Sequence, residues 1–456
     1  MDTQSKPPSP KNVPHVSYVH QDGTLVELVH NGTQTAFAVF KNGTFSIEPA
    51  FKKDERIVLV PYRAGNNIIR NGVVLFAEKP AEYGSHEDLF DEIRWYIHRY
   101  VDVPPAFERI ASAYVLLTWL YDRFKELPYL RLRGDYGSGK TRFLQIVGAI
   151  TYKPIFASGA STVSPLFHLL DTFRGTLIVD EADFRFTDEK AEIVKLLNNG
   201  NAAGMPVLRT IVTAEREYNP RAFTIFGPKL MATRGSFDDR ALESRFITEE
   251  MGTRPFRTGV PIILPDSQKA EAQALRNKLL LYRFRTWHKA TTVPYFFELT
   301  VEPRLKQIFV PLMSVVDDLE LRAELEEIAA RYSNQATLDR GLTLEAQLLE
   351  CISALWEDAG SAGVTVKAIA DEFLERFGTE YDNRITTKWI GGLVRRRLQL
   401  ATRKSRGSYV IPLEEAPKIN RLVEKYGIAD VPPSPDKTVV VPLNNQGSTD
   451  EPVIEA

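Results

Sequence analysis

Cysteine is almost absent from this chain of 456 residues. The single cysteine, Cys351, excludes an intrachain disulfide framework and a cysteine-rich zinc site. The seven histidines are scattered, and neither a His-x-x-x-His nor a Cys-x-x-Cys pair occurs. We therefore expect no metal centre that is built from protein ligands alone.

Long apolar segments and an excess of one charge are also lacking. The longest apolar run near a predicted helix, Ala113–Leu120, is far shorter than the roughly 20 residues that cross a bilayer. The first residues, MDTQSKPPSPKNVP, are polar and proline-rich, unlike a signal peptide. The formal net charge of −2 argues neither for nor against nucleic acid, because a local patch can hide in a neutral total. These features predict a soluble, cytoplasmic protein in a reducing compartment, without a membrane partner.

The most informative stretch is PYLRLRGDYGSGKT at residues 128–141. It fits G-x-x-x-x-G-K-[ST], the phosphate-binding P-loop motif. The preceding Tyr129–Leu132 reads as a short strand, and Arg142–Ile150 continues with helical periodicity. Strand, glycine-rich loop and helix form the context in which this motif is credible.

Each part of this loop has a chemical purpose. Glycines let backbone N–H groups turn towards phosphate oxygens, and the helix start adds a positive dipole end. Lys140 supplies a charge to the β- and γ-phosphates, and the Thr141 hydroxyl is a ligand for Mg²⁺. The predicted nucleotide-binding residues are Gly134, Asp135, Tyr136, Gly137, Ser138, Gly139, Lys140 and Thr141.

A second motif, GTLIVDEAD at Gly175–Asp183, follows forty residues later. Thr176–Val179 predicts a buried parallel strand that ends in two acids, and strand ends are where an α/β sheet exposes functional groups. Asp180 is the candidate Mg²⁺ ligand. Glu181 is the candidate general base that polarises the attacking water.

Two further elements follow in the same segment. Lys229–Ala232 predicts another central strand, and Thr233 at its end is placed to sense the γ-phosphate, although an ordinary turn threonine is an equal alternative. In Ser236–Met251 we expect a short helix that ends near Arg245, followed by a strand. At this distance past the two acids, Arg245 is a candidate arginine finger directed at a neighbouring subunit's nucleotide.

In this order, the P-loop, Leu177–Glu181, Phe226–Gly235 and Asp239–Phe246 resemble an AAA+ ATPase. The GPK-x-x-A strand followed by D-x-x-L-x-S-R-F resembles the helicase modules of MCM-like and of mobile-element or plasmid replication proteins. The resemblance covers about residues 125–335. It implies ATP and Mg²⁺ as cofactors and a homo-oligomeric ring, a hexamer, whose sites lie between subunits.

The resemblance also implies roles for individual residues. Asp180 and Glu181 correspond to the Walker B pair, Thr233 to the sensor and Arg245 to the finger. Thr233 departs from the asparagine often found at the sensor position. Arg240 is an alternative finger, and the lid arginine is either Arg304 or Arg276.

The connection at Asn198–Arg221 is long for its place and contains Arg209, Arg216 and Arg221. In the helicases that the chain resembles, this region carries loops that face the ring's pore, where basic side chains track a phosphate backbone. A solvated surface loop is the alternative.

The carboxyl-terminal part predicts three helices at Leu342–Asp358, Val366–Phe377 and Thr386–Leu400, then a strand–turn–strand at Ala401–Leu413. This order resembles a winged helix. Between Asn383 and Leu413 there is no acid, which favours DNA contact over the alternative of a protein-docking module. The candidate DNA-binding residues are Arg384, Lys388, Arg395, Arg403, Lys404 and Arg406.

The predicted fold is therefore α/β: a P-loop AAA+ sheet with a helical lid, between a small β-rich domain and a winged helix. The leading function is an ATP-hydrolysing motor on DNA, like a replicative helicase of a plasmid, phage or integrated element. The alternatives are a nucleotide-switched DNA-binding initiator or regulator and a remodeller of protein partners.

The predicted divisions are a disordered leader 1–14, a β-rich domain 15–85, the AAA+ core with its amino-terminal helices 86–265, the lid 266–335, the winged helix 342–427 and a disordered tail 430–456.

Overall fold

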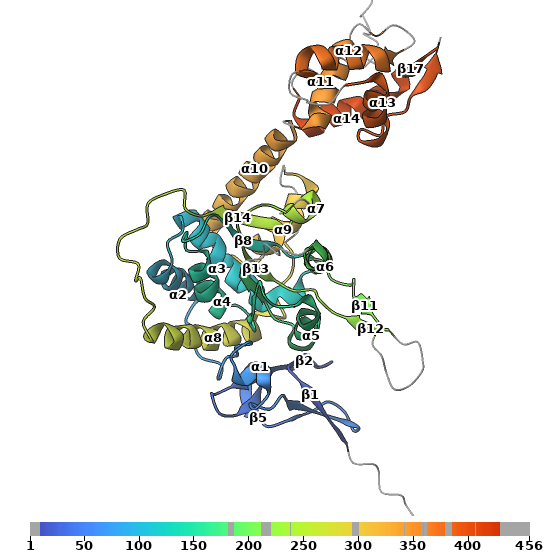
Figure 1. Ribbon diagram of the computed structural model, residues 1–456. Coiled ribbons are helices and arrows are strands. Elements are labelled where there is room, and N and C mark those ends of the chain that lie inside the picture. Colours follow the sequence, from blue (N-terminus) through green and yellow to red (C-terminus); the bar gives the residue numbers. More distant parts are fainter. Residues whose placement is uncertain are drawn as a thin grey trace, which may run out of the picture. The chain divides into compact units, whose positions relative to one another are not determined.

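The structure is a computed structural model that describes residues 10–180, 187–210, 220–237, 239–293, 301–341, 343–356, 359, 363–378, 385–405 and 407–428. The chain divides into two compact units, Met1–Ala330 and Arg331–Ala456 (Figure 1). Each unit is described by itself.

A five-stranded parallel sheet organises the first unit. Its order is β14-β8-β13-β10-β9, so β13 lies between the P-loop strand and the strand that ends in Asp180. The strands are short runs with few exposed side chains, as expected for a sheet covered on both faces. This confirms the predicted α/β class with a parallel sheet. The strands are β8 (Tyr129–Arg133), β9 (Ile155–Ser158), β10 (Leu177–Asp180), β13 (Lys229–Thr233) and β14 (Phe246–Glu250).

Helices flank this sheet, and one of them is buried along almost its whole length. From Phe107 to Leu120 only Arg109 of that helix, α3, escapes burial, and α3 contacts α2, α8 and α9. It begins at Pro105, a residue suited to a first helical turn. The helices up to β14 are α2 (His86–Tyr100), α3 (Pro105–Leu120), the 3₁₀ turn η1 (Tyr121–Arg123), α4 (Lys140–Ala149), α5 (Val163–Phe173), α6 (Thr187–Asn199) and α7 (Arg240–Glu243).

The segment after the sheet is helical, as its apolar spacing predicts. It contains α8 (Ser267–Thr286), α9 (Pro303–Met313) and α10 (Leu319–Gly341), and the unit boundary falls within α10. α8 packs against α2 and α3, and α9 packs against α3. No helix in the described part of the chain is long and apolar enough to cross a membrane.

The amino-terminal strands form two small sheets, β2-β3-β4-β5 and β1-β7-β6. The predicted hairpin is confirmed: β4 pairs with β5 across Asn42 and Gly43, which both adopt positive φ. Residues 11–14 were expected in the disordered leader but lie in β1, an edge strand, where Pro14 is tolerated. The elements are β1 (Lys11–His15), β2 (Ser17–Val19), β3 (Leu25–His30), β4 (Thr35–Lys41), β5 (Thr44–Glu48), β6 (Phe51–Lys52), β7 (Ile57–Pro61) and α1 (Asn67–Arg70).

These strands share one core with the parallel sheet. Val26 and Phe37 belong to the same buried cluster as Ile155 and Leu166. A buried ion network reinforces the junction, because Glu27 of β3 contacts Lys153 at 2.8 Å and Arg283 of α8 at 2.8 Å. Removing one member would leave an uncompensated buried charge, which is strongly destabilising.

A two-stranded antiparallel hairpin, β11 (Val207–Arg209) with β12 (Arg221–Phe223), extends from the first unit between α6 and β13. Residues 211–219 between its strands, with Arg216, lie outside the described residues.

The second unit is a cluster of helices against a three-stranded sheet, β15-β17-β16. The three helices and the strand–turn–strand are in their predicted places. β15 and α14 are additions: β15 has only two residues, too few for an alternating pattern. The buried positions of α14, Ala416, Ile419 and Val423, do follow a helical spacing that could have predicted this helix. The elements are α11 (Leu344–Trp356), β15 (Val364–Thr365), α12 (Val366–Phe377), α13 (Thr387–Arg396), β16 (Arg403–Ser405), β17 (Ser408–Ile411), the 3₁₀ turn η4 (Leu413–Glu415) and α14 (Ala416–Tyr426).

Candidate functional site

The P-loop joins the carboxyl end of β8 to the start of α4. Two of its glycines are required by their surroundings. A Cβ on Gly134, whose φ is +154°, would lie 2.5 Å from the Met251 carbonyl oxygen. Gly139 precedes the first turn of α4 at a φ of +91°, which side chains rarely adopt. The loop conformation therefore depends on glycine at both positions.

Lys140 lies in the first turn of α4 and folds back over the loop. Its Nζ donates to the carbonyl oxygens of Gly134 and Asp135, both at 2.6 Å, and lies 3.3 Å from Ser138 Oγ. The ammonium group is thus held inside the concave face of the loop, where it would meet a phosphate.

Thr141 and Asp180 meet across the mouth of the loop. The Thr141 hydroxyl donates to Asp180 Oδ2 at 2.8 Å, although the residues come from α4 and β10. Oxygen ligands of this kind suit Mg²⁺, which is usually held by one or two carboxylates together with substrate phosphates and water. Among the described residues there is no group of three or more His, Cys, Asp or Glu that would hold a metal alone. The donor set therefore fits a Mg²⁺ ion that arrives with a nucleotide.

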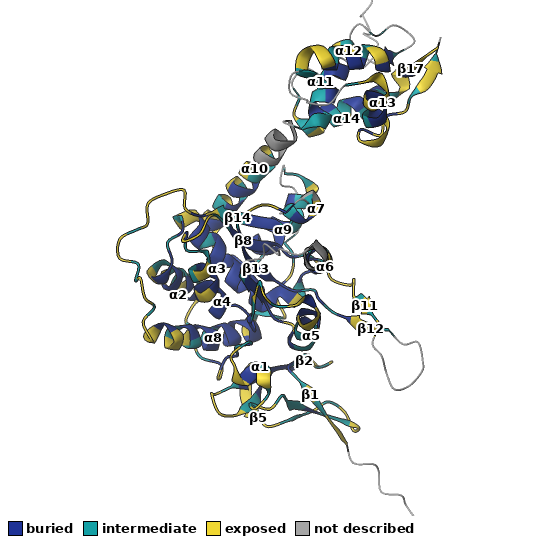
Figure 2. Cartoon of the chain, viewed as in Figure 1, coloured by how far each residue is buried: buried dark blue, intermediate teal, exposed yellow. Residues whose placement is uncertain are grey.

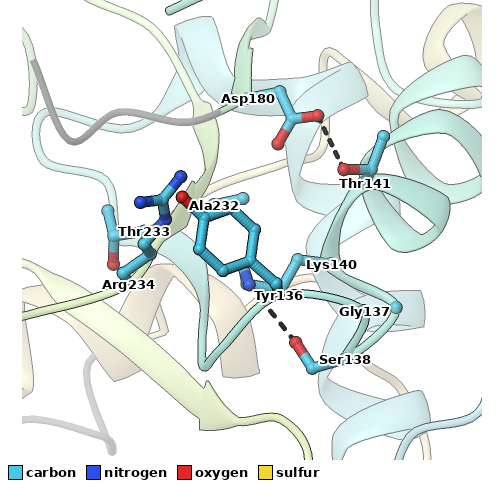
Figure 3. Close-up of a pocket in the computed structure, with 10 residues that line it drawn as sticks. Tyr136, Gly137, Ser138, Lys140, Thr141, Asp180, Ala232, Thr233 and Arg234 are labelled. Carbon is cyan, nitrogen blue, oxygen red and sulfur yellow. Dashed lines mark hydrogen bonds between the residues drawn. The ribbon is translucent and has the colours of Figure 1, made fainter.

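A cavity of about 290 Å³ lies in front of these residues (Figure 3). Thr233, at the end of β13, is 1% exposed and lines it. Its Oγ1 has no hydrogen-bond partner in the described part of the chain, which is unusual for a buried hydroxyl and suits a ligand in the cavity. The lining residues are Tyr136, Gly137, Ser138, Gly139, Lys140, Thr141, Asp180, Ala232, Thr233 and Arg234.

The sequence does not predict the contact between Tyr136 and Arg234 at the cavity's edge. The Arg234 guanidinium carbon lies 3.7 Å from the centre of the Tyr136 ring. Tyr136 is 72% exposed. A cation–π pair between the P-loop and the residue after β13 brings a further positive charge to the cavity.

The proposed general base, Glu181, lies outside the described residues. The proposed finger, Arg245, is not part of the cavity. It precedes β14, and in a parallel sheet that position lies at the edge opposite the P-loop, a strand's length of about 16 Å away. The structure therefore separates Arg245 from the cavity of its own chain.

Arg245 is held at this second edge by two side chains that the sequence does not single out. Its Nε donates to Asn201 Oδ1 at 2.8 Å, and its guanidinium also donates to Asn198 Oδ1 at 2.6 Å. Burial, with a smaller contribution from the nearby Arg304, lowers the pKa of Arg245. Such an arrangement holds the guanidinium in one orientation.

Of the two candidate lid arginines, Arg276 is buried and donates to the backbone carbonyls of Phe76 and Ala149. Arg304, in α9, lies 3.4 Å from Ser244 Oγ, beside Arg245. Neither lines the phosphate cavity. Arg240, the alternative finger, begins α7.

Lys229 supports the edge that carries Arg245. It is fully buried, and its Nζ donates to the carbonyls of Gly200, Ile225 and Gly227 at 3.0–3.1 Å. Burial without an acidic partner lowers the pKa of Lys229 to about 7. Because Gly200 lies between Asn198 and Asn201, the lysine holds the turn whose side chains hold Arg245.

Two basic residues of the β11–β12 hairpin, Arg209 and Arg221, contact residues of α5 and α6. Arg209 pairs with Glu192 at 3.3 Å, and Arg221 pairs with Asp171 at 3.1 Å. Both guanidiniums also stack on aromatic rings, Arg209 on Phe167. These contacts fix the orientation of the hairpin.

In the second unit, the candidate DNA-binding residues Lys388, Arg395, Arg403 and Lys404 are exposed. Lys388 and Arg395 lie two helical turns apart on α13, and the helix buries Ile390 and Val394 instead. Arg403 has one exposed ion pair, with Glu414 at 3.4 Å. Arg384 and Arg406 lie outside the described residues.

No protein-family model and no curated protein matches the chain. Solved structures are similar to it at low sequence identity. The apo C-terminal region of NrS-1 aligns over 85% of this chain and 97% of its own, with 11% identity and a TM-score of 0.37. A full-length MCM homolog from Methanopyrus kandleri aligns over 71% and 77%, with 12% identity and a TM-score of 0.37. JCV helicase aligns over 56% and 63%, with 12% identity and a TM-score of 0.23. All three TM-scores lie below 0.5, so these similarities assign no function to the chain.

Proposed function

We propose that this chain is an ATP-hydrolysing AAA+ motor that acts on DNA, like the replicative helicase of a plasmid, phage or integrated element. The observation that carries this is the hydrogen bond of 2.8 Å between Thr141 and Asp180 at the mouth of a P-loop cavity, with the unpartnered Thr233 hydroxyl lining the same cavity. A P-loop hydroxyl beside a carboxylate at a strand end is the arrangement of P-loop NTPases.

Thr141 and Asp180 would hold Mg²⁺, which would supply positive charge to offset the charge that develops during hydrolysis. Lys140 binds the β- and γ-phosphates, and Thr141 with Asp180 orients the metal. Glu181 follows Asp180 directly, so it would direct a water molecule at the γ-phosphate. Thr233 would donate its hydroxyl to the γ-phosphate or to that water.

The geometry of Arg245 supports a site that a second copy of the chain completes. Arg245 lies at the edge of the sheet opposite its own P-loop, yet it is held firmly by Asn198 and Asn201. A guanidinium oriented in this way would serve a neighbour's nucleotide, with Arg304 beside it. We therefore propose a homo-oligomeric ring, as a hexamer, with Arg245 acting in trans.

The basic surface of the second unit supports DNA as the partner. We propose that this unit is a winged helix, with α13 as its recognition helix and the β16–β17 hairpin as its wing. Lys388 and Arg395 would act along the helix, and Arg403 and Lys404 on the wing, in contact with phosphates or base edges. Arg384 and Arg406, which lie outside the described residues, are proposed as further DNA contacts.

A nucleotide-switched DNA-binding initiator is the second candidate. The same basic surface favours it, because duplex binding by this unit requires no movement along DNA. A remodeller of protein partners would use the unit as a docking surface and would not depend on its arginines.

Three measurements distinguish these functions: the ATPase rate with and without single-stranded DNA, ATP-dependent unwinding of a forked duplex, and ATP-dependent binding of duplex DNA. A motor is stimulated by single strands and unwinds, whereas a switch binds duplex without either property. In both cases Lys140→Ala abolishes nucleotide binding. Two results together would favour the remodeller. DNA would leave the ATPase rate of the wild-type chain unchanged, and neutralising the exposed arginines would leave partner binding unchanged.

A further inference from the structure

The loop between β14 and α8, residues 251–265, runs beside the P-loop, and we call it the strap. Its start is tied to β8, because the Met251 N–H donates to the Arg133 carbonyl at 2.6 Å. Asp102 accepts from the Arg257 N–H and from the Arg254 guanidinium, both at 2.7 Å. Polar contacts therefore hold the first half of the strap.

The second half is held by the P-loop helix itself. Arg142, which directly follows Thr141, donates to the carbonyl oxygens of Pro261 at 2.7 Å and of Ile262 at 2.5 Å. The strap thus lies beside the P-loop and the first turn of α4, with its backbone fixed at several points.

Three apolar residues of the strap are nevertheless exposed, and Figure 2 colours much of this segment as exposed. Ile262 is 92% exposed and Ile263 is 85% exposed, and Phe256 is 62% exposed. Exposed apolar residues gathered on one ordered segment are unusual on a monomer and typically mark a contact surface.

A second pair of exposed apolar residues lies in β11 and just before it. Met205 is 66% exposed and Leu208 is 64% exposed. They follow Asn201, which accepts a hydrogen bond from Arg245. In Figure 1 the strap runs along one side of the first unit, whereas α7 and the β11–β12 hairpin lie on the opposite side.

We propose that the strap of one subunit docks on the Met205–Leu208 surface of a second copy of this chain, with Ile262 and Ile263 as the central apolar contacts. This rests on the proposed function, because it supplies the contact that would bring Arg245 of one copy to the phosphate cavity of the next. The two surfaces differ, so the contact is head-to-tail, and head-to-tail contacts close into rings when the rotation allows it.

The positions of the two surfaces indicate why a second copy of this chain, and not another protein, would cover the strap. The strap is bonded to the residue after Thr141, and the other surface begins four residues after Asn201. In this proposal, one contact between them would bring the edge that carries Arg245 in one copy towards the P-loop of another. An unrelated partner on the strap would block this approach.

The test uses the full chain with Mg²⁺ and a non-hydrolysable ATP analogue, and measures mass in solution by sedimentation. The strap variant, Ile262→Asp with Ile263→Asp, should assemble at least about a hundredfold more weakly, because two charges would enter an apolar contact. The matched control is Ile47→Asp, a 47%-exposed isoleucine on β5, which should assemble like the wild-type chain.

A second variant tests the head-to-tail arrangement. Met205→Asp with Leu208→Asp should also fail to assemble alone. Mixed in equal amounts, the two variants should form dimers and nothing larger, because only one intact pair of surfaces remains. Full assembly of the Met205/Leu208 variant alone would show strap-on-strap contact and overturn the proposal.

Nucleotide affinity, measured by calorimetry at concentrations where the strap variant is monomeric, separates this proposal from the proposed function. Unchanged affinity with lost assembly is the expected result. Lost affinity with unchanged assembly would make the strap a cover for its own nucleotide and overturn the interface. A wild-type chain that binds ATP but never assembles would overturn the interface and leave the phosphate site intact; one that assembles but binds no ATP would refute the proposed function alone.

Discussion

The two edges of the parallel sheet are built differently. At the carboxyl edge, a glycine loop, Thr141, Asp180 and Thr233 surround an open cavity of about 290 Å³. At the amino edge, Arg245 is held by two asparagines, and a fully buried lysine supports their turn. The first edge offers unfilled hydrogen-bonding capacity to a ligand, whereas the second has used its polar groups to orient one cation. The proposed function uses both edges, and within one chain they lie a strand's length of about 16 Å apart.

The largest effect should come from removing the cation at the amino edge. Arg245→Ala should lower the ATPase rate by about a thousandfold or more, because an arginine finger stabilises charge in the transition state. Nucleotide affinity should stay near the wild-type value, because Arg245 lies away from its own cavity. Rates are measured at saturating ATP, alone and after mixing with Lys140→Ala subunits.

Mixing should restore part of the activity, since Lys140→Ala subunits lend their finger to intact P-loops. A mixture that is as inactive as its components would place Arg245 outside the catalytic site, and the two edges of the sheet would then have no shared function.

The second effect concerns Lys229. Its pKa in the folded chain, about 7, lies below its ordinary value, so the unfolded chain binds more protons between these two values. Folding stability should therefore rise with pH from about 7 upwards, by at most about 1.4 kcal/mol per pH unit. Denaturant unfolding of the wild-type chain and of Lys229→Met at pH 7 and pH 9 measures this dependence.

Lys229→Met should remove this pH dependence and lower stability overall, because three buried carbonyls lose their donor. The substitution should also reduce the ATPase activity that depends on Arg245 acting at a neighbouring copy, while the nucleotide affinity of the Lys229→Met chain itself stays unchanged. Equal pH slopes in the two chains would mean that Lys229 stays charged throughout.

The third effect is smaller and belongs to the carboxyl edge. Thr233→Val keeps the shape of the side chain and removes the unpartnered hydroxyl. The hydrolysis rate should fall by about ten- to a hundredfold. The free energy of unfolding should be unchanged or higher, because Thr233 Oγ1 makes no hydrogen bond to the described residues that the substitution could remove. Thr233→Ser is the control that keeps the hydroxyl, and a wild-type rate for Thr233→Val would assign the residue to the ordinary end of a strand.

The smallest effect opposes that of Lys229 in sign. Burial raises the pKa of Glu249, on β14, to about 7. The folded chain then binds the extra proton, so stability should fall as pH rises from about 4.5 to 7. Glu249→Gln should stabilise the chain at pH 8 by about 1 kcal/mol, a value reduced for the partial exposure of the side chain. Thermal unfolding at pH 5 and pH 8 tests it, with Glu55→Gln, an exposed glutamate between β6 and β7, as control.

The difference between the two edges also explains why the sequence predicts the residues at the carboxyl edge. A P-loop is a local object: its glycines, lysine and threonine are contiguous, and strand, loop and helix follow one another within about twenty residues. Asp180 and Thr233 are predictable for a related reason, because each directly follows a short apolar run, and parallel strands bring their carboxyl ends to one edge.

The amino edge has no such local signal. Asn198 and Asn201 lie in one turn, whereas Lys229 and Arg245 lie further along the chain, and only folding brings these polar atoms together. The sequence also does not predict that the amino-terminal strands share a core with the parallel sheet, because Glu27 and Phe37 have partners more than a hundred residues away.

By itself, then, the sequence determined the elements whose causes are local: the α/β alternation, the glycine loop, the acid at the end of β10 and the hairpin at Asn42-Gly43. The tertiary structure decided which of the charged residues are buried, which edge Arg245 occupies and that a strap with two exposed isoleucines lies beside the P-loop. The reason is physical. Backbone conformation depends on neighbours in sequence, whereas burial and the pairing of charges depend on neighbours in space.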